Sequence, residues 1–133
     1  MDDSDAIQNV KARYCAAADA IPDDVEAARA QFAGLFTPDV TADYGIDPIV
    51  GPDALVEFLT TAIAAGSDWM IHMIGSPLIE VDGDRATGSW ALAVHSRRKA
   101  TGERDLYVGR YADAFRKVGG EWKIASVAFI RRE

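Results

Sequence analysis

The sequence predicts one α+β domain, spanning residues 1–133, in which three N-terminal helices precede a strongly curved, mainly antiparallel sheet. Two observations carry this prediction. Apolar residues recur with a period of about 3.6 as far as Gly66 and with a period of about two beyond it. Turn sequences at 82–84, 101–103 and 119–120 then divide the remainder into long strands, as in a meander. One sheet of long strands must curl to bury a face, so we expect a cone-shaped barrel closed at one end by the helices.

Each predicted helix has an apolar stripe and a signal at its ends. Ser4 caps the first helix, and Pro22 stops it. Pro52 occupies the first position of the third helix, where no backbone N–H is needed, and Gly66 ends that helix. The predicted helices are 4–21, 23–36 and 51–66.

The strands are predicted from alternation of apolar and polar residues between turn signals. Thr37-Pro38-Asp39 is expected to be a turn, and residues 45–50 a loop. Pro77 has no N–H to give to a sheet, so it marks an edge or a bulge in its strand. The predicted strands are 40–44, 69–81, 85–99, 104–118 and 121–132.

Composition excludes several classes of partner. The chain has 133 residues, 49% of them hydrophobic, and a net charge of −7. A protein that binds nucleic acid or an anionic membrane surface needs clustered Lys and Arg, so we expect neither partner. Cys15 is the single cysteine and cannot form an internal disulfide. The N-terminus has no signal-peptide pattern and no apolar run is long enough to span a bilayer, so we expect a soluble cytoplasmic protein.

His72 is the most informative residue of the predicted strand 69–81. Alternation places Met70, His72 and Ile74 on one face, and Ile71 and Met73 on the other. Histidine is the side chain whose ordinary pKa lies between pH 5 and 8, which suits it to carry a proton at neutral pH. The alternative is a core histidine whose ring nitrogens are satisfied by backbone or hydroxyl partners.

Asp19 lies in the last turn of the first predicted helix, where the helix macrodipole disfavours a carboxylate. A helical projection groups it with a small and nearly uncharged face, which we expect to be covered or to line a cavity. The remaining members of that face are Gln8, Ala12, Cys15 and Ala16. The alternative is an exposed aspartate at a frayed helix end.

A series of short motifs runs along nearly the whole chain in a characteristic order. The motifs are Tyr14 with Asp19, 35–39, Gly51 opening a helix, His72, 81–86, 109–113 and 120–124. Their order and spacing resemble those of the SnoaL-like branch of the nuclear transport factor 2 (NTF2-like) superfamily. The resemblance implies a cone-shaped α+β barrel with a deep pocket, often assembled as a dimer. Because both enzymes and non-catalytic proteins share this fold, the fold does not decide the function.

The resemblance also implies roles for single residues. Asp19 and His72 fall on the catalytic Asp and His of the group that contains scytalone dehydratase, bile acid 7α-dehydratase and lindane dehydrochlorinase. Tyr44 resembles a scytalone dehydratase tyrosine that contacts substrate through a water, and Tyr14 resembles a tyrosine of the bile acid dehydratase. His95 is similar to a second histidine of scytalone dehydratase, although its spacing is off by one residue, which turns a strand side chain to the other face. The resemblance to the dehydrochlorinase further implies a guanidinium at the pocket, from Arg131 or its neighbour Arg132; the alternative is a solvated tail.

We expect the pocket wall to be largely apolar. The residues expected there, besides Tyr14, Tyr44, His95 and Arg131, are Phe58, Leu59, Met73, Trp90 and Tyr111. Gly109 and Tyr111 stand where scytalone dehydratase has a Ser and an Asn, so a different substrate is expected.

A His–Asp pair in an apolar pocket predicts proton transfer: the carboxylate orients the ring, and the second ring nitrogen accepts a proton. The leading hypothesis is a cofactor-independent lyase of the dehydratase type, or an isomerase, that acts on a small apolar hydroxylated or carbonyl compound. No metal and no cofactor are expected, since two histidines make a poor zinc site. A small-molecule binding module and an assembly domain, like the β subunit of a ring-hydroxylating dioxygenase, are the alternatives. We expect a homodimer or higher homo-oligomer, because the outer strand faces are rich in Ala and Val.

Overall fold

The structure is a computed structural model that describes residues 2–132. Its helices are α1 (Asp3–Ala20), α2 (Val25–Phe32) and α3 (Pro52–Gly66). Its strands are β1 (Phe36–Asp43), β2 (Ile49–Val50), β3 (Ser67–Asp82), β4 (Arg85–Arg98), β5 (Arg104–Val118) and β6 (Glu121–Arg131). No helix within residues 2–132 is long and apolar enough to cross a lipid bilayer.

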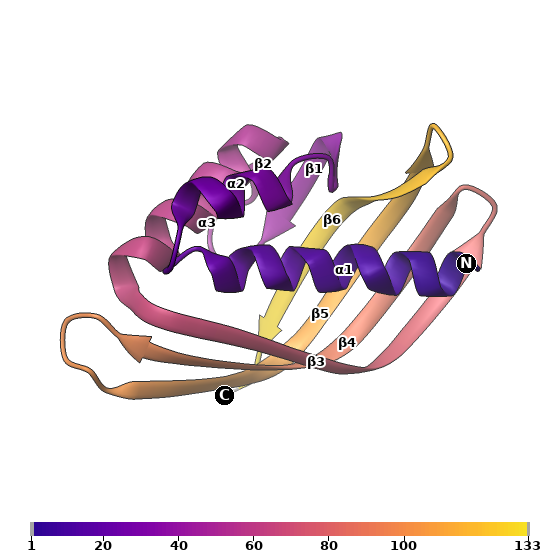
Figure 1. The fold of residues 1–133 in the computed structure, drawn as a ribbon. Helices are drawn as coiled ribbons and strands as arrows, with labels where there is room; N and C mark the ends of the chain where they lie inside the picture. Colours follow the sequence, from indigo (N-terminus) through magenta and orange to yellow (C-terminus); the bar gives the residue numbers. More distant parts are fainter. Residues whose placement is uncertain (1, 133) are drawn as a thin grey trace.

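The strands form one curved, unclosed sheet in the order β2-β1-β6-β5-β4-β3. Neighbouring strands are antiparallel except for β1 and β6, which run parallel. Figure 1 shows α1 crossing one face of the sheet, while α2 and α3 lie together beside β1 and β2. The predicted fold class, three helices followed by a curved and mainly antiparallel sheet, is confirmed.

The first helix begins slightly earlier than the sequence predicted. The Asp2 side chain, not that of Ser4, caps α1 by accepting a hydrogen bond from the Asp5 N–H at 2.8 Å. Aspartate and serine are similarly good caps, so composition could not choose between neighbouring positions.

The segment after the second helix differs more from the prediction than the first helix does. α2 ends at Phe32: Ala33 leaves the helical conformation with a ψ of 130°, and Gly34 follows with a φ of +80°, which favours glycine. Residues 37–39, expected to be a turn, belong to β1, whose beginning pairs in parallel with β6 through the register Phe36↔Ile124. Residues 45–50, expected to be a loop, contain β2, which pairs with β1. Pro38 and Asp39 lie in an irregular stretch of β1 between the paired residues Phe36 and Thr41, so the pairing on either side keeps them extended despite their turn propensity.

The bulge expected near Pro77 is present. The pairing of β3 with β4 shifts register between Gly75 and Leu78, and Ser76 adopts a φ of +49°. Such a bulge bends its strand and increases the local twist. It therefore contributes to the curvature that lets the sheet wrap around α1.

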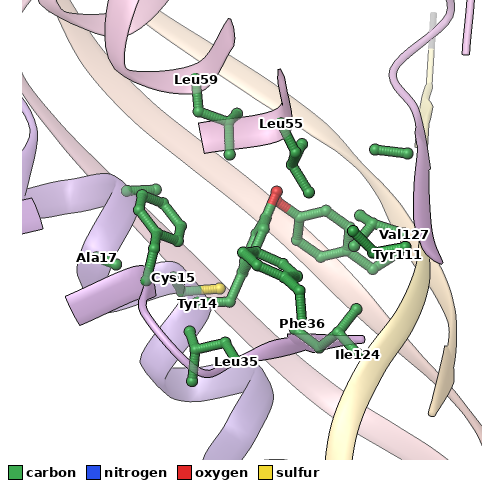
Figure 2. Close-up of a cluster of buried hydrophobic side chains, with 14 of the residues drawn as sticks. Tyr14, Cys15, Ala17, Leu35, Phe36, Leu55, Leu59, Tyr111, Ile124 and Val127 are labelled. Carbon is green, nitrogen blue, oxygen red and sulfur yellow. The ribbon is translucent and has the colours of Figure 1, made fainter. Parts of the chain in front are cut away.

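The core lies between α1 and the inner face of the sheet. Large aromatic and aliphatic side chains fill it and are almost inaccessible to solvent. Figure 2 shows part of this cluster, drawn from α1, α3, the strands and the segment between α2 and β1; the labelled residues are Tyr14, Cys15, Ala17, Leu35, Phe36, Leu55, Leu59, Tyr111, Ile124 and Val127. The alternation of β4, in which Trp90, Leu92 and Val94 are buried, sets which of its residues face this core.

Candidate functional site

An apolar cavity of about 330 Å³ lies between the inner face of the sheet and the helices. Its walls come from α1, α3 and all the long strands, so it exists only when the sheet is curved around the helices. The lining residues are Tyr14, Ala18, Tyr44, Phe58, Leu59, Ile63, Met70, His72, Val94, Tyr107, Tyr111, Phe129 and Arg131.

Asp19 and His72 are in hydrogen-bond contact at this cavity. Asp19 Oδ1 lies 2.7 Å from His72 Nδ1. The backbone N–H of His72 also donates to both carboxylate oxygens, at 3.0 Å and 3.1 Å. These contacts satisfy a carboxylate that the macrodipole of α1 would otherwise disfavour. Asp19 is therefore not a frayed surface residue, and it joins the end of α1 to β3.

The hydrogen bonds also set the orientation of the imidazole. A carboxylate can only accept, so a neutral His72 carries its proton on Nδ1 and keeps a lone pair on Nε2. Nδ1 is occupied by Asp19, while His72 itself lines the cavity. The pair can thus accept a proton from a molecule in the cavity, and Asp19 can stabilise the imidazolium that forms.

Tyr14 and Tyr44 place a second polar group in the cavity wall. Their hydroxyl oxygens are 2.6 Å apart. Burial raises the pKa of both phenols above the usual value for tyrosine, so both are neutral at physiological pH. In a neutral pair only one hydroxyl donates to the other, which leaves the second proton free to be donated to a ligand. This arrangement can stabilise negative charge on a bound oxygen.

Several further predicted residues line the same cavity. Phe58 and Leu59 reach it from α3, Tyr111 from β5 and Arg131 from the end of β6. The Arg131 guanidinium lies 4.4 Å from the centroid of the Tyr107 ring. Of the lining residues, Arg131 alone carries a permanent charge, at an exposed end of the strand.

Three residues expected in the pocket wall lie elsewhere. Met73 and His95 are on the outer face of the sheet, because Met73 follows His72 directly and His95 pairs with Ile71 of β3. The shift of one residue relative to scytalone dehydratase therefore does turn the His95 side chain outward. Its ring packs on the Trp69 ring, with 5.8 Å between the two centroids. Trp90 is on the inner face but packs deep in the core. The cavity wall therefore does not contain these three residues, which were expected in it.

The cavity also has lining residues that were not predicted from the sequence. Met70 and Val94 share the inner face with His72 and Leu92, and Ile63 lies one helical turn after Leu59. Tyr107 and Phe129 precede Tyr111 and Arg131 by even spacings on their strands, so the period of two would have placed them on the same face. Ala18 gave no signal beyond the apolar stripe of its helix.

The cavity and its surroundings offer no evident metal centre. Within residues 2–132, no group of three or more His, Cys, Asp or Glu side chains is placed so that it could hold a metal ion. Asp19 and His72 bind each other instead.

Comparison with known proteins places this chain in a family. A family model of the SnoaL-like domain matches residues 1–128. No curated protein matches the chain in sequence. A Mycobacterium tuberculosis protein of unknown function, Rv3472, is similar in structure and 29% identical, with a TM-score of 0.81 over 96% of this chain and 75% of that one.

Structures of two enzyme-like proteins are also similar. A candidate scytalone dehydratase from Novosphingobium aromaticivorans DSM 12444 is 21% identical, with a TM-score of 0.83 over 98% of this chain and 84% of that one. The hexachlorocyclohexane dehydrochlorinase LinA-type3 from Novosphingobium barchaimii LL02 is 16% identical, with a TM-score of 0.85 over 98% of this chain and 86% of that one. At these identities the likeness shows a shared fold.

Proposed function

Because the chain belongs to the SnoaL-like family, we propose that it is a cofactor-independent lyase or isomerase in which His72 is the general base. The observation that carries this proposal is the hydrogen bond of 2.7 Å between Asp19 and His72 at the wall of an apolar cavity. An imidazole held in a fixed position can reach the C–H proton of the substrate, and an apolar wall keeps water away from the carbanion or enolate that then forms. The similar dehydratase-type and dehydrochlorinase structures support an elimination.

In the proposed reaction, His72 Nε2 takes a proton from a carbon next to a carbonyl or similar activating group. The electron pair of that C–H bond moves into the activating group, and Tyr14 or Tyr44 donates a hydrogen bond to the oxygen that becomes negative. Asp19 stabilises the imidazolium. In an elimination, the electron pair then expels a hydroxyl group, which leaves as water with the proton from His72. In an isomerisation, His72 returns the proton to a different carbon.

The cavity favours a small and largely apolar substrate. Phe58, Leu59 and Phe129 provide apolar surface, whereas the hydroxyls of Tyr14 and Tyr44 provide a local polar site. A hydroxylated or carbonyl compound of this kind would place its carbon skeleton against the apolar wall and its oxygen at the tyrosines.

The proposed function is tested by proton exchange in heavy water. A panel of hydroxylated polyketide, steroid and aromatic compounds is first screened for binding by thermal shift. Each compound that binds is then incubated with the protein in heavy water, and proton NMR follows the C–H next to its activating group. We expect that signal to disappear, through exchange or elimination, in the wild type and not in His72→Gln. Binding without exchange or elimination across all bound compounds would support the alternative of a binding module.

We also propose that the outer face of the sheet joins two copies of this chain. Leu106, Ile130 and Met73 are exposed there by 59%, 57% and 47%. Contiguous apolar surface of this kind marks interaction sites in soluble proteins. Light scattering at micromolar concentration is expected to give the mass of a dimer or higher oligomer, and Leu106→Glu is expected to weaken the assembly without unfolding the protein. A monomer mass for the wild type would refute this proposal.

A further inference from the structure

Lys11 and Asp113 form an ion pair in the interior, and the proposed reaction does not use it. Lys11 Nζ lies 2.7 Å from Asp113 Oδ2, and both side chains are 0% exposed. Burial lowers the pKa of Lys11 and raises that of Asp113, while each opposes the shift of the other. Because the desolvation of two charges costs several kcal/mol per ion, such a pair is rarely placed in a core for stability. Its surroundings suggest another role.

The Lys11 ammonium packs on two tyrosine rings that line the cavity. Its Nζ lies 4.0 Å from the centroid of the Tyr14 ring and 3.4 Å from that of the Tyr111 ring. The two rings meet edge to face, with centroids 5.8 Å apart and an angle of 89° between their planes. Figure 2 shows the two tyrosine side chains next to each other. A cation at this distance from a ring face is attracted by the quadrupole of the ring.

The sequence explains how these four groups meet. Lys11 precedes Tyr14 by three residues and therefore shares its face of α1. Tyr111 precedes Asp113 by two residues and shares the inner face of β5. The helix thus supplies the cation and one phenol, and the strand supplies the anion and the other phenol. The ion pair fixes α1 against β5 at the point where both tyrosines enter the cavity wall.

We propose that Lys11 is a positioning residue for the tyrosines: its buried ammonium holds the Tyr14 and Tyr111 rings in place and strengthens the stabilisation of a negatively charged oxygen by the cavity hydroxyls. The ammonium lies against the faces of both rings and withdraws electron density from them, which makes their O–H groups stronger donors. The Asp113 carboxylate opposes this effect, since its charge raises the pKa of Tyr14, Tyr44 and Tyr111. The ring contacts belong to Lys11, so we expect the cation to outweigh the anion for an oxygen bound at the hydroxyls. Tyr14 passes this effect to Tyr44, whose hydroxyl lies 2.6 Å away. The inference rests on the proposed function in that it takes this cavity as the reaction site.

The test compares an ionised probe with a neutral probe of similar shape. Para-nitrophenol titrates near neutral pH and changes colour on ionisation, so its bound state is seen directly; nitrobenzene is the neutral control. The variant is the double substitution K11M/D113N, which removes both charges and nearly keeps the volume. Replacement of a whole buried ion pair by neutral groups is often tolerated. Arg131 is unchanged in this variant, so its attraction for an anion cancels in the comparison.

We expect the ionised probe to bind the double variant a few-fold more weakly than the wild type, because the loss of the nearer Lys11 charge is partly offset by the loss of Asp113, while nitrobenzene binds both equally. Lys11→Arg, which keeps the charge, is expected to retain most of the preference for the ionised probe. Lys117→Met is the matched control, because Lys117 also lies near a ring, that of Trp122 at 5.7 Å, but outside the cavity. It is expected to change neither affinity.

Two outcomes would overturn the inference. If both probes lose affinity equally in K11M/D113N, the ion pair acts through packing alone. If the wild type does not prefer the ionised probe, or if Lys11→Arg loses the preference while folded, the charge of Lys11 does not act on the cavity. Should the double variant not fold, Arg131→Gln decides: a preference for the ionised probe that persists without Arg131 supports the inference, and its loss overturns it. The heavy-water assay is independent: its failure with the probe preference intact refutes the proposed reaction and not this inference.

Discussion

His72→Gln is expected to lower kcat on the true substrate by about 10²- to 10⁴-fold, the usual contribution of a general base. Glutamine has a similar reach and still packs in the cavity wall, but it has no nitrogen that accepts a proton. The backbone N–H of residue 72 still donates to Asp19, so the contact between α1 and β3 is kept. The melting temperature is therefore expected to change little.

His95→Gln is the matched control for this substitution. His95 is a histidine on the neighbouring strand β4, but its ring packs on Trp69 at the outer face of the sheet. Its replacement is expected to leave kcat and KM unchanged. If His72→Gln retained nearly full activity in steady-state kinetics, His72 would not be the base, and proton abstraction would have to be assigned to another group.

Asp113→Asn is expected to reduce the free energy of unfolding by about 3–5 kcal/mol, because it leaves a buried ammonium without its counter-ion. The loss is expected to depend on pH. Burial already lowers the pKa of Lys11, and removal of Asp113 takes away the charge that opposes this shift, so the folded chain holds this proton less strongly than the unfolded chain does. The unfolded state then binds more protons, and stability rises with pH. Denaturant titrations at several pH values should show that the difference in the free energy of unfolding between the wild type and Asp113→Asn becomes smaller as the pH rises towards the ordinary pKa of lysine.

Asp39→Asn is the control, since Asp39 pairs with Arg116 at 2.8 Å on the surface. The hydrogen bond from Arg116 is the main cause that lowers the pKa of Asp39 to about 2. Solvent screens this pair, so its loss is expected to matter far less than the loss of Asp113. Equal effects of the two substitutions would show that the Lys11–Asp113 pair is not buried in solution.

The sequence allowed most of the fold to be predicted where the signal is local. Residues 104–118 were bounded correctly because alternation and turn residues delimit β5. β1 was only partly found, since its first residue, Phe36, pairs in parallel with Ile124 of β6, which is distant in sequence. A run containing Pro38 and Asp39 gives no local sign of that partner.

The candidate site was predictable to a similar extent. Asp19 was singled out by its unfavourable place at a helix end and His72 by its definite strand face, but the expectation that the two meet came from the resemblance to the SnoaL-like group. Met73 was predicted to lie in the pocket, although the alternation of its strand already placed its side chain on the outer face of the sheet. The contact between Lys11 and Asp113 could not be foreseen, because charged residues are mostly exposed and nothing local links a helix position to a strand so far along the chain.

In the proposed function, Asp19 holds His72 so that its Nε2 offers a lone pair to the cavity. Nitrogen-15 NMR of the histidine rings, at a pH where they are neutral, tests it directly because protonated and unprotonated ring nitrogens have distinct shifts. We predict that wild-type His72 carries its proton on Nδ1, and that Asp19→Asn, whose amide group can donate to Nδ1, moves the proton to Nε2. His95, which lies on the other face, should not change and serves as the internal reference. A wild-type His72 with its proton on Nε2 would contradict the account, because no lone pair would then face the cavity.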